Sequence, residues 1–408
     1  MKHLIGGISS AGRALPEING QAFSVARSHG PWLWGNDGER YLDTAMGFGA
    51  TMLGHAHPAV VDAICRAASN GLMPSFAHGL EEQAAASLAS FTGPLSQVVF
   101  VNTGSEAVHL ACRVARAATG RQQVAKFAAG YDGWFDAVAF GNAGSAAAAM
   151  AGPRPQQNGM WLLRYNDFDD AERLFQDCPE LAAVVVEPVL ANAGCVAPAP
   201  GYLKHLCEVA HRHGALVILD EVLMGFRLQA GLSGHLLGAD ADIATVGKAI
   251  GSGMPVAAVV GKPEVMAVLT DGRANRAGTY NGAPPACAAV IATLEQLRHQ
   301  DYPALLAAGD ATRARIAQAF AEHGQSVCSS GYGSVFTFWQ GSVVPQTYQQ
   351  AAACADQGWT ERLHAALRGQ QVLSMPFAFG RAYLTFAHGA AELERLVEGY
   401  RAAALSLA

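Results

Sequence analysis

Short apolar runs alternate with helix-like segments along most of this chain, and this alternation restricts the fold more than any other feature of the sequence. Strand-like runs occupy residues 97–102, 123–127, 182–187, 215–220, 242–246 and 256–260. Several of them are apolar throughout, which is typical of strands buried on both faces of a sheet. Helical periodicity is found at residues 59–70, 80–91 and 105–118. We therefore predict an α/β fold with a mostly parallel, doubly wound sheet.

The two ends of the chain have a different pattern from this central part. Residues 327–339 and 383–388 are predicted strands, and a helix is predicted from residue 390 to the end. We expect a large domain at 58–284, and a smaller α+β domain formed by the N-terminal segment 1–57 and the C-terminal segment 285–408.

Residues 141–158 are rich in Gly, Ala and Pro and lack charges at helical spacing. A long structureless loop in a compact domain is usually disordered or functional, and we interpret this one as a lid.

Composition excludes several classes of protein. Only 15% of the residues are charged, the net charge is −6, and lysines and arginines form no run, so we expect no nucleic-acid partner. No apolar stretch approaches the ~20 residues of a membrane span, and no apolar segment of a signal peptide follows Lys2. The 8 cysteines are scattered without C-x-x-C spacing, which favours a reduced, cytoplasmic protein. The low charge content also favours an oligomer.

Polar residues stand at the ends of the predicted strands, where open α/β sheets bind ligands. In residues 103–106 (TGSE) a glycine and the free amides of a helix start favour a phosphate, although an ordinary helix cap has the same composition. Asp220 ends an apolar strand, and a buried carboxylate there needs a cationic partner unless it only caps the next loop.

Two further segments complete this set. Lys248 lies between a strand and the glycine-rich AIGSG, where desolvation would lower its pKa and suit it to form a Schiff base. The turn 278–282 (GTYNG) carries a hydroxyl suited to a phosphate. An anion cradle, a buried carboxylate and an isolated lysine together are the parts of a pyridoxal 5'-phosphate (PLP) site.

Other interpretations of the motifs are weaker. His55 and His57 cannot complete a zinc site by themselves, so we expect no metal. The stretch GFGATMLG at 47–54 lacks the spacing of a dinucleotide fingerprint. Trp134 and Phe48 fit equally as core residues or as walls of a substrate pocket. A non-catalytic scaffold remains a second class of function, which the presence of both a lysine and an aspartate at the strand ends disfavours.

The chain resembles the class III (fold type I) aminotransferases, and among them the glutamate-1-semialdehyde aminomutase group. The resemblance extends from residue 6 to residue 388. It is carried by YLDTAMGFGATMLGHAHPAVVDA (41–63), FVNTGSEAVHLACRVARAATGR (100–121), AAVVVEPVLANAGCVAPAPGYL (182–203), ALVILDEVLMGFR (215–227), GKAIGSGMPVAAVVG (247–261) and GTYNG (278–282).

The resemblance implies a role for each matching residue around PLP. Lys248 would form the Schiff base and later move a proton, and Asp220 would hold the pyridine nitrogen. Val222 would pack on one face of the ring, and Tyr131 would stack on the other. The remaining implied contacts are with the phosphate (Gly104, Ser105 and, from the neighbouring subunit, Thr279), the phenolic oxygen (Asn192) and the carboxylate that supports this region (Glu187). The family forms dimers with shared sites, so we expect a homodimer.

Several positions depart from the family pattern. Asp132 replaces the histidine of G-Y-H-G, and Leu223 replaces a common Gln or Met. Where the aminomutases carry a glutamate, this chain has Arg381 and no acid. Ser10 and Arg13 match the positions that grip a substrate carboxylate. We therefore expect an aminotransferase that acts on a small amino donor with a carboxylate and a keto or aldehyde acceptor. A 2,1-aminomutase or a related racemase stays an alternative.

Overall fold

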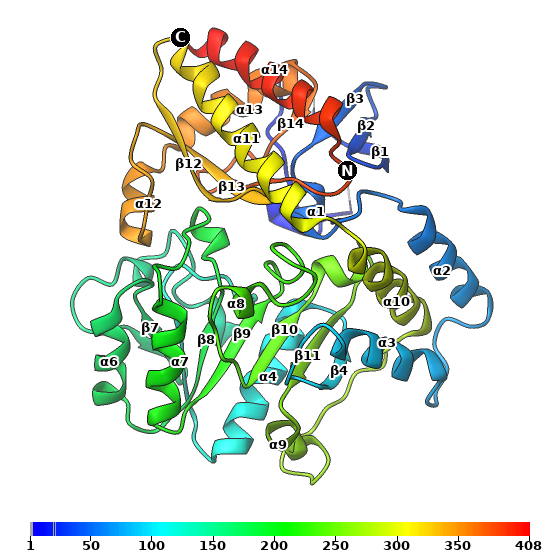
Figure 1. Ribbon diagram of the computed structural model, residues 1–408, viewed down its shortest axis with the longest axis vertical. Helices are drawn as coiled ribbons and strands as arrows, with labels where there is room; N and C mark the ends of the chain where they lie inside the picture. The colour runs from blue at the N-terminus through cyan, green and yellow to red at the C-terminus, as the bar shows by residue number, and fades with distance from the viewer. Residues whose placement is uncertain (1–2, 19, 21) are drawn as a thin grey trace.

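The computed structural model describes residues 3–18, 20 and 22–408. Its centre is an eight-stranded sheet in the order β4-β11-β10-β9-β8-β5-β7-β6 (Figure 1). The strands are β4 (Gln97–Val101), β5 (Gln123–Phe127), β6 (Gln156–Gln157), β7 (Met160–Leu163), β8 (Leu181–Val186), β9 (Leu216–Glu221), β10 (Ile243–Val246) and β11 (Ala257–Gly261). The predicted α/β class with a mostly parallel sheet is confirmed.

The antiparallel members of this sheet are β11 and β6. The connection 247–256 between β10 and β11 is shorter than the dozen or more residues that a parallel crossover needs, so β11 runs back beside β10. Strands β6 and β7 were not predicted from the sequence. They form a short hairpin after residue 155 and extend the sheet beyond β5.

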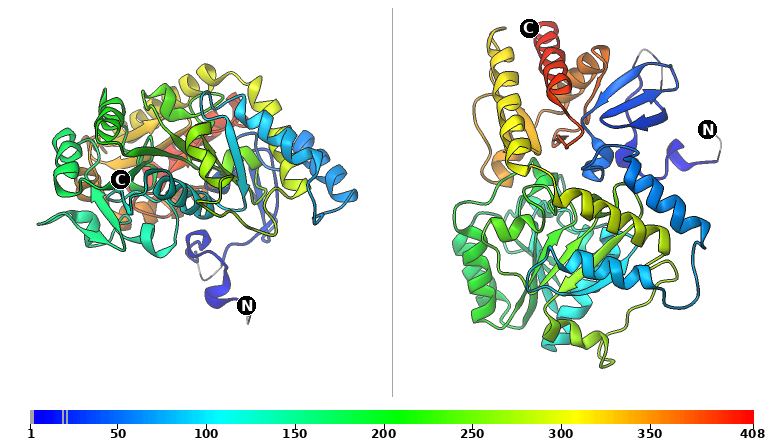
Figure 2. Two further views of the ribbon diagram at one scale, coloured as in Figure 1. Left: turned by 90° about the horizontal axis from the view of Figure 1, so that it is seen from below. Right: turned by 45° about the vertical axis from the view of Figure 1, so that its right-hand side comes forward.

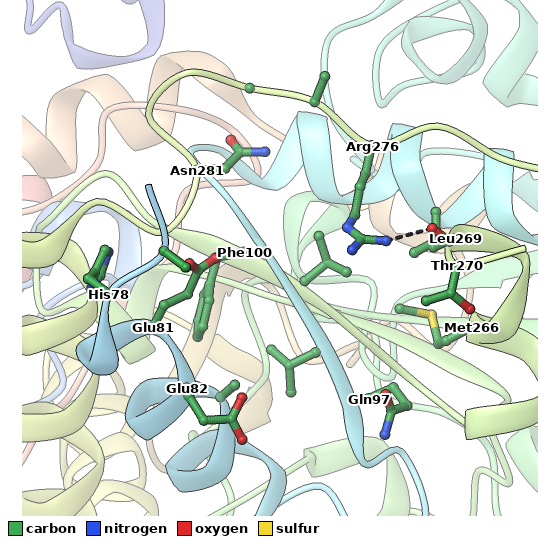
Figure 3. Close-up of a pocket in the computed structure, with 16 residues that line it drawn as sticks. His78, Glu81, Glu82, Gln97, Phe100, Met266, Leu269, Thr270, Arg276 and Asn281 are labelled. Carbon is green, nitrogen blue, oxygen red and sulfur yellow. Dashed lines mark hydrogen bonds between the residues drawn. The ribbon is translucent and has the colours of Figure 1, made fainter. Parts of the chain in front are cut away.

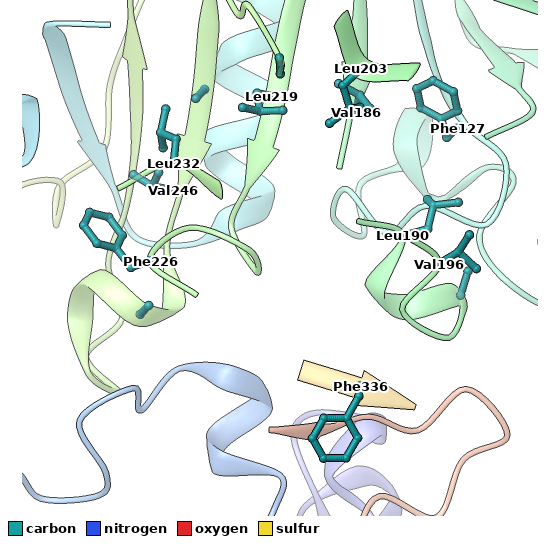
Figure 4. Close-up of a cluster of buried hydrophobic side chains, with 14 of the residues drawn as sticks. Phe127, Val186, Leu190, Val196, Leu203, Leu219, Phe226, Leu232, Val246 and Phe336 are labelled. Atoms are coloured by element: carbon teal, nitrogen blue, oxygen red, sulfur yellow. The ribbon is translucent and has the colours of Figure 1, made fainter. Parts of the chain in front are cut away.

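Both faces of the central strands are buried, which explains their continuous apolar sequences. Val186, Leu219 and Val246 point into one hydrophobic cluster, which Figure 4 shows. Val185 and Ile218, one position away on the same strands, point into a second cluster on the other face. Helices cover both faces, namely α4 (Gly104–Thr119) on the second cluster, and α6 (Phe168–Asp177) and α7 (Tyr202–Arg212) on the first.

Three helices pack together near the β4 edge of the sheet (Figure 1). They are α2 (Pro58–Ser69), α3 (Gly79–Ala89) and α10 (Pro284–Arg298). Helix α10 begins at the predicted domain boundary and packs on α2 and α3. The division of the chain at residues 57 and 284 stays a prediction.

The N- and C-terminal segments meet above the carboxyl ends of the large sheet. A four-stranded sheet combines β1 (Val25–His29), β2 (Trp32–Gly35) and β3 (Arg40–Asp43) with β14 (Val372–Leu373). A three-stranded sheet contains β12 (Val327–Tyr332), β13 (Val335–Gln340) and β15 (Ala382–Tyr383). The helices beside them are α11 (Tyr302–Ala321), α12 (Tyr348–Cys354), α13 (Gln357–Gly369) and α14 (Ala390–Leu407).

The predicted strand at 383–388 is too long. Only Ala382–Tyr383 pair with β13, and the chain then turns, with the Thr385 hydroxyl 3.0 Å from Nδ1 of His388. The remaining short elements are α1 (Met46–Gly49), α5 (Asp136–Ala139), α8 (Ser233–Leu236), α9 (Pro263–Met266), η1 (Ile5–Gly7), η2 (Ala11–Arg13), η3 (Ala147–Ala149), η4 (Ala191–Ala193), η5 (Lys248–Gly251) and η6 (Ala267–Leu269). Within the described residues, no helix has both the length and the apolarity to cross a bilayer.

The segment 141–158 has more structure than the sequence suggested. It contains η3 and β6, and Met150 is 3% exposed. The Met150 carbonyl accepts a hydrogen bond from Nη2 of Arg164 at 2.7 Å, and Arg154 pairs with the buried Asp170 at 2.9 Å. The segment is therefore not structureless, because buried side chains and arginine contacts tie it to the large sheet, and its interpretation as a lid stays a prediction.

Candidate active site

A cavity of about 330 Å³ opens at the carboxyl ends of the central strands. It collects most of the predicted site residues from separate parts of the chain, namely Gly104, Ser105, Tyr131, Glu187, Asn192, Asp220, Val222 and Lys248. Trp134, Asp132 and Leu223 also line it, together with Ala50 from the N-terminal segment. The strand-end pattern therefore located one continuous site.

Asp220 is held at the end of β9 by two hydrogen bonds to a single carboxylate oxygen. Thr245, its direct neighbour on β10, donates its hydroxyl to Oδ1 at 3.0 Å, and the Val222 amide donates to the same oxygen at 2.9 Å. Burial, reinforced by the charge of Asp132, raises the pKa of Asp220 to about 7. A cation placed against this carboxylate would stabilise its charged form, and a protonated pyridine nitrogen is such a cation.

Lys248 begins η5 directly after β10 and has a positive φ of 42°, an uncommon conformation for a residue with a side chain. Burial and, after it, the positive charge of Arg381 lower the pKa of its amine to about 8, although Asp220 and Glu187 act in the opposite direction. The free amine is therefore accessible near neutral pH, as a nucleophile requires.

The start of α4 has the features of a phosphate cradle. Thr103 and Glu106 form a reciprocal cap, in which the Glu106 amide donates to the Thr103 hydroxyl at 3.2 Å and the Thr103 amide donates to Oε2 of Glu106 at 2.9 Å. Gly104 and Ser105 lie between these two residues, and within the described chain their backbone amides have no hydrogen-bond acceptor. Such free amides at a helix N-terminus favour a phosphate.

Close backbone packing shapes this cradle. A Cβ atom on Gly104 would lie 2.7 Å from Cγ1 of Val222, and one on Gly133, whose φ is +122°, would lie 2.9 Å from Oγ of Ser105. Only glycine permits these approaches, so the cradle and the Val222 side chain lie side by side. This donor set and its shape fit PLP, with Gly104 and Ser105 at the phosphate, Asp220 at the nitrogen and Lys248 at the aldehyde carbon.

The segment that carries Tyr131 forms another wall of the site. The Tyr131 amide donates to Oε1 of Glu187 at 2.9 Å, and the Tyr131 side chain is 44% exposed. Burial and the charges of Asp132 and Asp220 raise the pKa of Glu187 well above its usual range. Three acidic residues, Asp132, Glu187 and Asp220, thus line the cavity.

Three predicted residues do not line this cavity. Thr279 is exposed, in a turn that the Asn102 side chain holds through Oδ1 of Asn281 at 2.9 Å. Ser10 and Arg13 are exposed in the segment that extends away from the rest of the chain (Figure 2). Their roles stay predictions.

A larger cavity of about 480 Å³ lies beside β4 (Figure 3). Its wall includes Glu81, Glu82 and Arg276, and Nη1 of Arg276 donates to the Leu269 carbonyl at 2.6 Å. None of the residues predicted for the PLP site lines it. Gly278 and Asn281 do, so this cavity adjoins the turn that carries Thr279.

Sequence reasoning missed several residues that organise the site. Thr245 could have been found, because it stands three residues before Lys248 in the strand that neighbours Asp220. Lys126 is a single charge in an apolar strand, and its ammonium lies 2.9 Å from Asp132. The hydrogen bond between Arg381 and Tyr383 could not be predicted, because the sequence shows only that the two residues are two positions apart.

A nucleophilic lysine, a buried aspartate on the neighbouring strand and a phosphate cradle at a helix start together define a PLP-dependent enzyme of fold type I. The sequence model of the family "Aminotransferase class-III" matches residues 16–327. The chain belongs to this family of PLP-dependent aminotransferases and aminomutases.

Individual relatives agree with this assignment. The chain is 35% identical over 403 residues to a glutamate-1-semialdehyde 2,1-aminomutase of Nitrosospira multiformis, covering 97% of this chain and 94% of the relative. Its fold is similar to an omega-transaminase from Sphaerobacter thermophilus, with a TM-score of 0.88, 29% identity, and coverage of 99% and 94% of the two chains. A transaminase solved with PLP bound has a TM-score of 0.86 at 26% identity, covering 99% of this chain and 95% of that one.

Proposed function

We propose that this enzyme is an aminotransferase that moves an amino group between a small, carboxylate-bearing amino substrate and a keto or aldehyde acceptor. The observation that carries the proposal is the position of Arg381. This guanidinium is partly buried, lines a small separate pocket of about 30 Å³ rather than the PLP cavity itself, and acts electrostatically on Lys248. Within the described chain it forms no ion pair with an acid.

Arg381 is oriented by a neighbouring side chain. Its Nε donates to the Tyr383 hydroxyl at 2.8 Å, which leaves its two terminal nitrogens for another acceptor. A partly buried guanidinium without an acid partner is stabilised by a carboxylate, which it binds through two parallel hydrogen bonds. A substrate carboxylate supplies this partner. The exposed Arg13 would have to move, or act in a neighbouring subunit, to do the same.

The chain's own residues account for the common chemistry of the family. Bound PLP supplies an electron-withdrawing ring that weakens the bonds at the substrate carbon. Among the residues that the structure describes, Lys248 is the only lysine that lines the cavity. Its amine would therefore hold the cofactor and would take up and return the proton at that carbon. Asp220 would keep the ring nitrogen protonated, and Val222 and Tyr131, which line the same cavity, would hold the ring between them.

The site supports intermolecular transfer more than an aminomutase reaction. Aminomutation requires the enzyme to retain the intermediate between the two half reactions. At the place where the aminomutases carry a glutamate, this chain has Arg381 and no acid, so it lacks that support. The aminomutase, or a related racemase, remains the second candidate, and the identity to an aminomutase supports it.

The reaction type is tested by mixing the PLP enzyme with a panel of amines and amino acids without an acceptor. An aminotransferase is expected to convert its PLP stoichiometrically to pyridoxamine phosphate and to release one equivalent of keto product, measured by absorbance and mass spectrometry. Catalytic isomerisation of glutamate 1-semialdehyde without an added acceptor would establish the aminomutase instead, and racemisation of an amino acid would establish the racemase.

The carboxylate site is tested by comparing Arg381→Met with Arg13→Met. Loss of a hydrogen-bonded charge partner weakens binding by about 1.5–3 kcal/mol, so Arg381→Met should raise the KM of carboxylate-bearing donors about 10-fold to 100-fold. Amines without a carboxylate should be affected little. If Arg13→Met produces this selective effect and Arg381→Met does not, the carboxylate is held by the N-terminal segment.

We also propose that the protein is a homodimer with shared active sites. Phe76 and Tyr280, which are 86% and 66% exposed, are chain neighbours of residues that line the larger cavity. Exposed aromatic side chains around a concavity are typical of an interface between subunits. A second copy seated there would cover these rings and place its own Thr279 near the first copy's phosphate cradle.

Mixed dimers test this sharing directly. A heterodimer of one Lys248→Ala subunit and one Thr279→Val subunit contains one fully intact site if Thr279 acts across the interface. If Thr279 acts within its own subunit, both sites carry one defect. We therefore expect half of the sites in the purified heterodimer to bind PLP with wild-type affinity, and uniformly weakened binding would contradict the proposal. Sedimentation should show a dimer for each variant.

A further inference from the structure

We propose that the buried ion pair of Lys126 and Asp132, which lies behind the Tyr131 wall, is a positioning element that fixes this wall and balances the charge around PLP. This role does not depend on the identity of the substrate, or on whether the enzyme is an aminotransferase or an aminomutase. It concerns a lysine for which neither the motifs nor the family resemblance gave a function.

Lys126 has an unusual environment for a lysine. It lies in β5 with 0% of its surface exposed. Its ammonium donates to the carbonyl of Gly130 at 2.8 Å, the carbonyl of Val138 at 2.7 Å and Oδ1 of Asn142 at 3.1 Å. These acceptors come from the beginning, middle and end of one segment, so a single ammonium clamps residues 130–142.

The clamp acts on the residues that face the cofactor. Gly130 is bound to Lys126 through its carbonyl, the Tyr131 amide is bound to Glu187, and Oδ2 of Asp132 lies 2.9 Å from the Lys126 ammonium. Three consecutive residues are therefore each tied to a buried charged group. These contacts fix the backbone from which the Tyr131 ring extends.

Lys126 also contacts one of two neighbouring carboxylates. A Cβ atom on Gly130 would lie 3.4 Å from Oδ2 of Asp132 and 3.4 Å from Oε1 of Glu187. The two carboxyl groups therefore lie close to the same glycine. Within a buried site such a pair of acids requires a nearby cation, and Lys126 is in direct contact with one of them.

The groups that act electrostatically on the Lys248 position belong to several elements. The acids are Asp220 on β9 and Glu187 after β8, and the cations are Arg381 before β15 and Arg227 after β9. The charge of Asp132 acts on both acids, because after burial it is the next cause that raises the pKa of Asp220 and of Glu187. Replacing Lys126 by a neutral residue therefore makes the net charge around the PLP cavity more negative, and replacing Asp132 by a neutral residue makes it less negative.

The test uses Lys126→Met, Asp132→Asn and the double variant, all as PLP enzymes. A more negative site stabilises the protonated form of the lysine-bound cofactor. The pH midpoint of its visible absorption band should therefore rise by about one pH unit in Lys126→Met and fall by about one in Asp132→Asn. The double variant should have a midpoint near that of the wild type. We also expect PLP affinity to fall at least about tenfold in Lys126→Met, through loss of the clamp.

Lys262→Met is the matched control. Lys262 forms the same kind of ion pair with Asp242, at 2.8 Å, but neither residue lines the PLP cavity. Its removal should leave the midpoint and the PLP affinity unchanged. A purely structural role for Lys126 would lower the melting temperature without opposite shifts of the midpoint, and this result would overturn the proposal. If Lys126→Met does not fold, Asp132→Asn decides, because an unchanged or raised midpoint there contradicts the charge assignment.

Discussion

The carboxylate of Asp220, buried at the end of the central strand β9, is the group on which the rest of the site depends. It is 4% exposed, and both of its hydrogen bonds go to one oxygen. A charged group in this position is unfavourable unless a cation meets the second oxygen, so the folded chain contains a site that a protonated pyridine ring stabilises. The neighbouring strand supplies Thr245, which orients the carboxylate, and Lys248 follows three residues later and lines the same cavity.

The substrate side of this site is built by the two ends of the chain. Arg227 is fully buried where they meet, and its guanidinium donates to the carbonyls of Gly49 and Ser334 and lies 4.8 Å from the centre of the Tyr383 ring. Tyr383 in turn orients Arg381. The packing of the N- and C-terminal segments on the large sheet is thereby connected to the guanidinium that we assign to the substrate carboxylate.

The sequence predicted the large sheet and its ligand-binding edge because buried parallel strands have continuous apolar runs and end at polar residues. Lys248 and Asp220 followed from that pattern alone. The strand direction of β11 and the hairpin of β6 and β7 were missed, since both depend on connection length and tertiary packing rather than on periodicity. The segment 141–158 was misjudged for a similar reason, because its order comes from Arg154 and Arg164, which contact distant backbone and acids.

The contacts that support the site could not be predicted from the sequence. Nothing in a local pattern shows that Lys126 reaches Val138 and Asn142, or that Arg381 comes close enough to Lys248 to change its pKa. These contacts exist only after the strands and the two chain ends are assembled. The family resemblance, in contrast, named cofactor positions within continuous motifs, and the structure brings all of them except Thr279 to one cavity. Their contacts with PLP stay predictions.

The central claim is that Lys248, and not the fully buried Lys126, carries the cofactor. Borohydride reduction of the PLP enzyme, followed by proteolysis and mass spectrometry, measures which lysine is covalently modified. The structure predicts a single phosphopyridoxyl group on the peptide that contains Lys248, with Lys126 unmodified. A modification on Lys126 or on another lysine, or the absence of any stoichiometric label in an enzyme that binds PLP, would contradict the assignment of the active site.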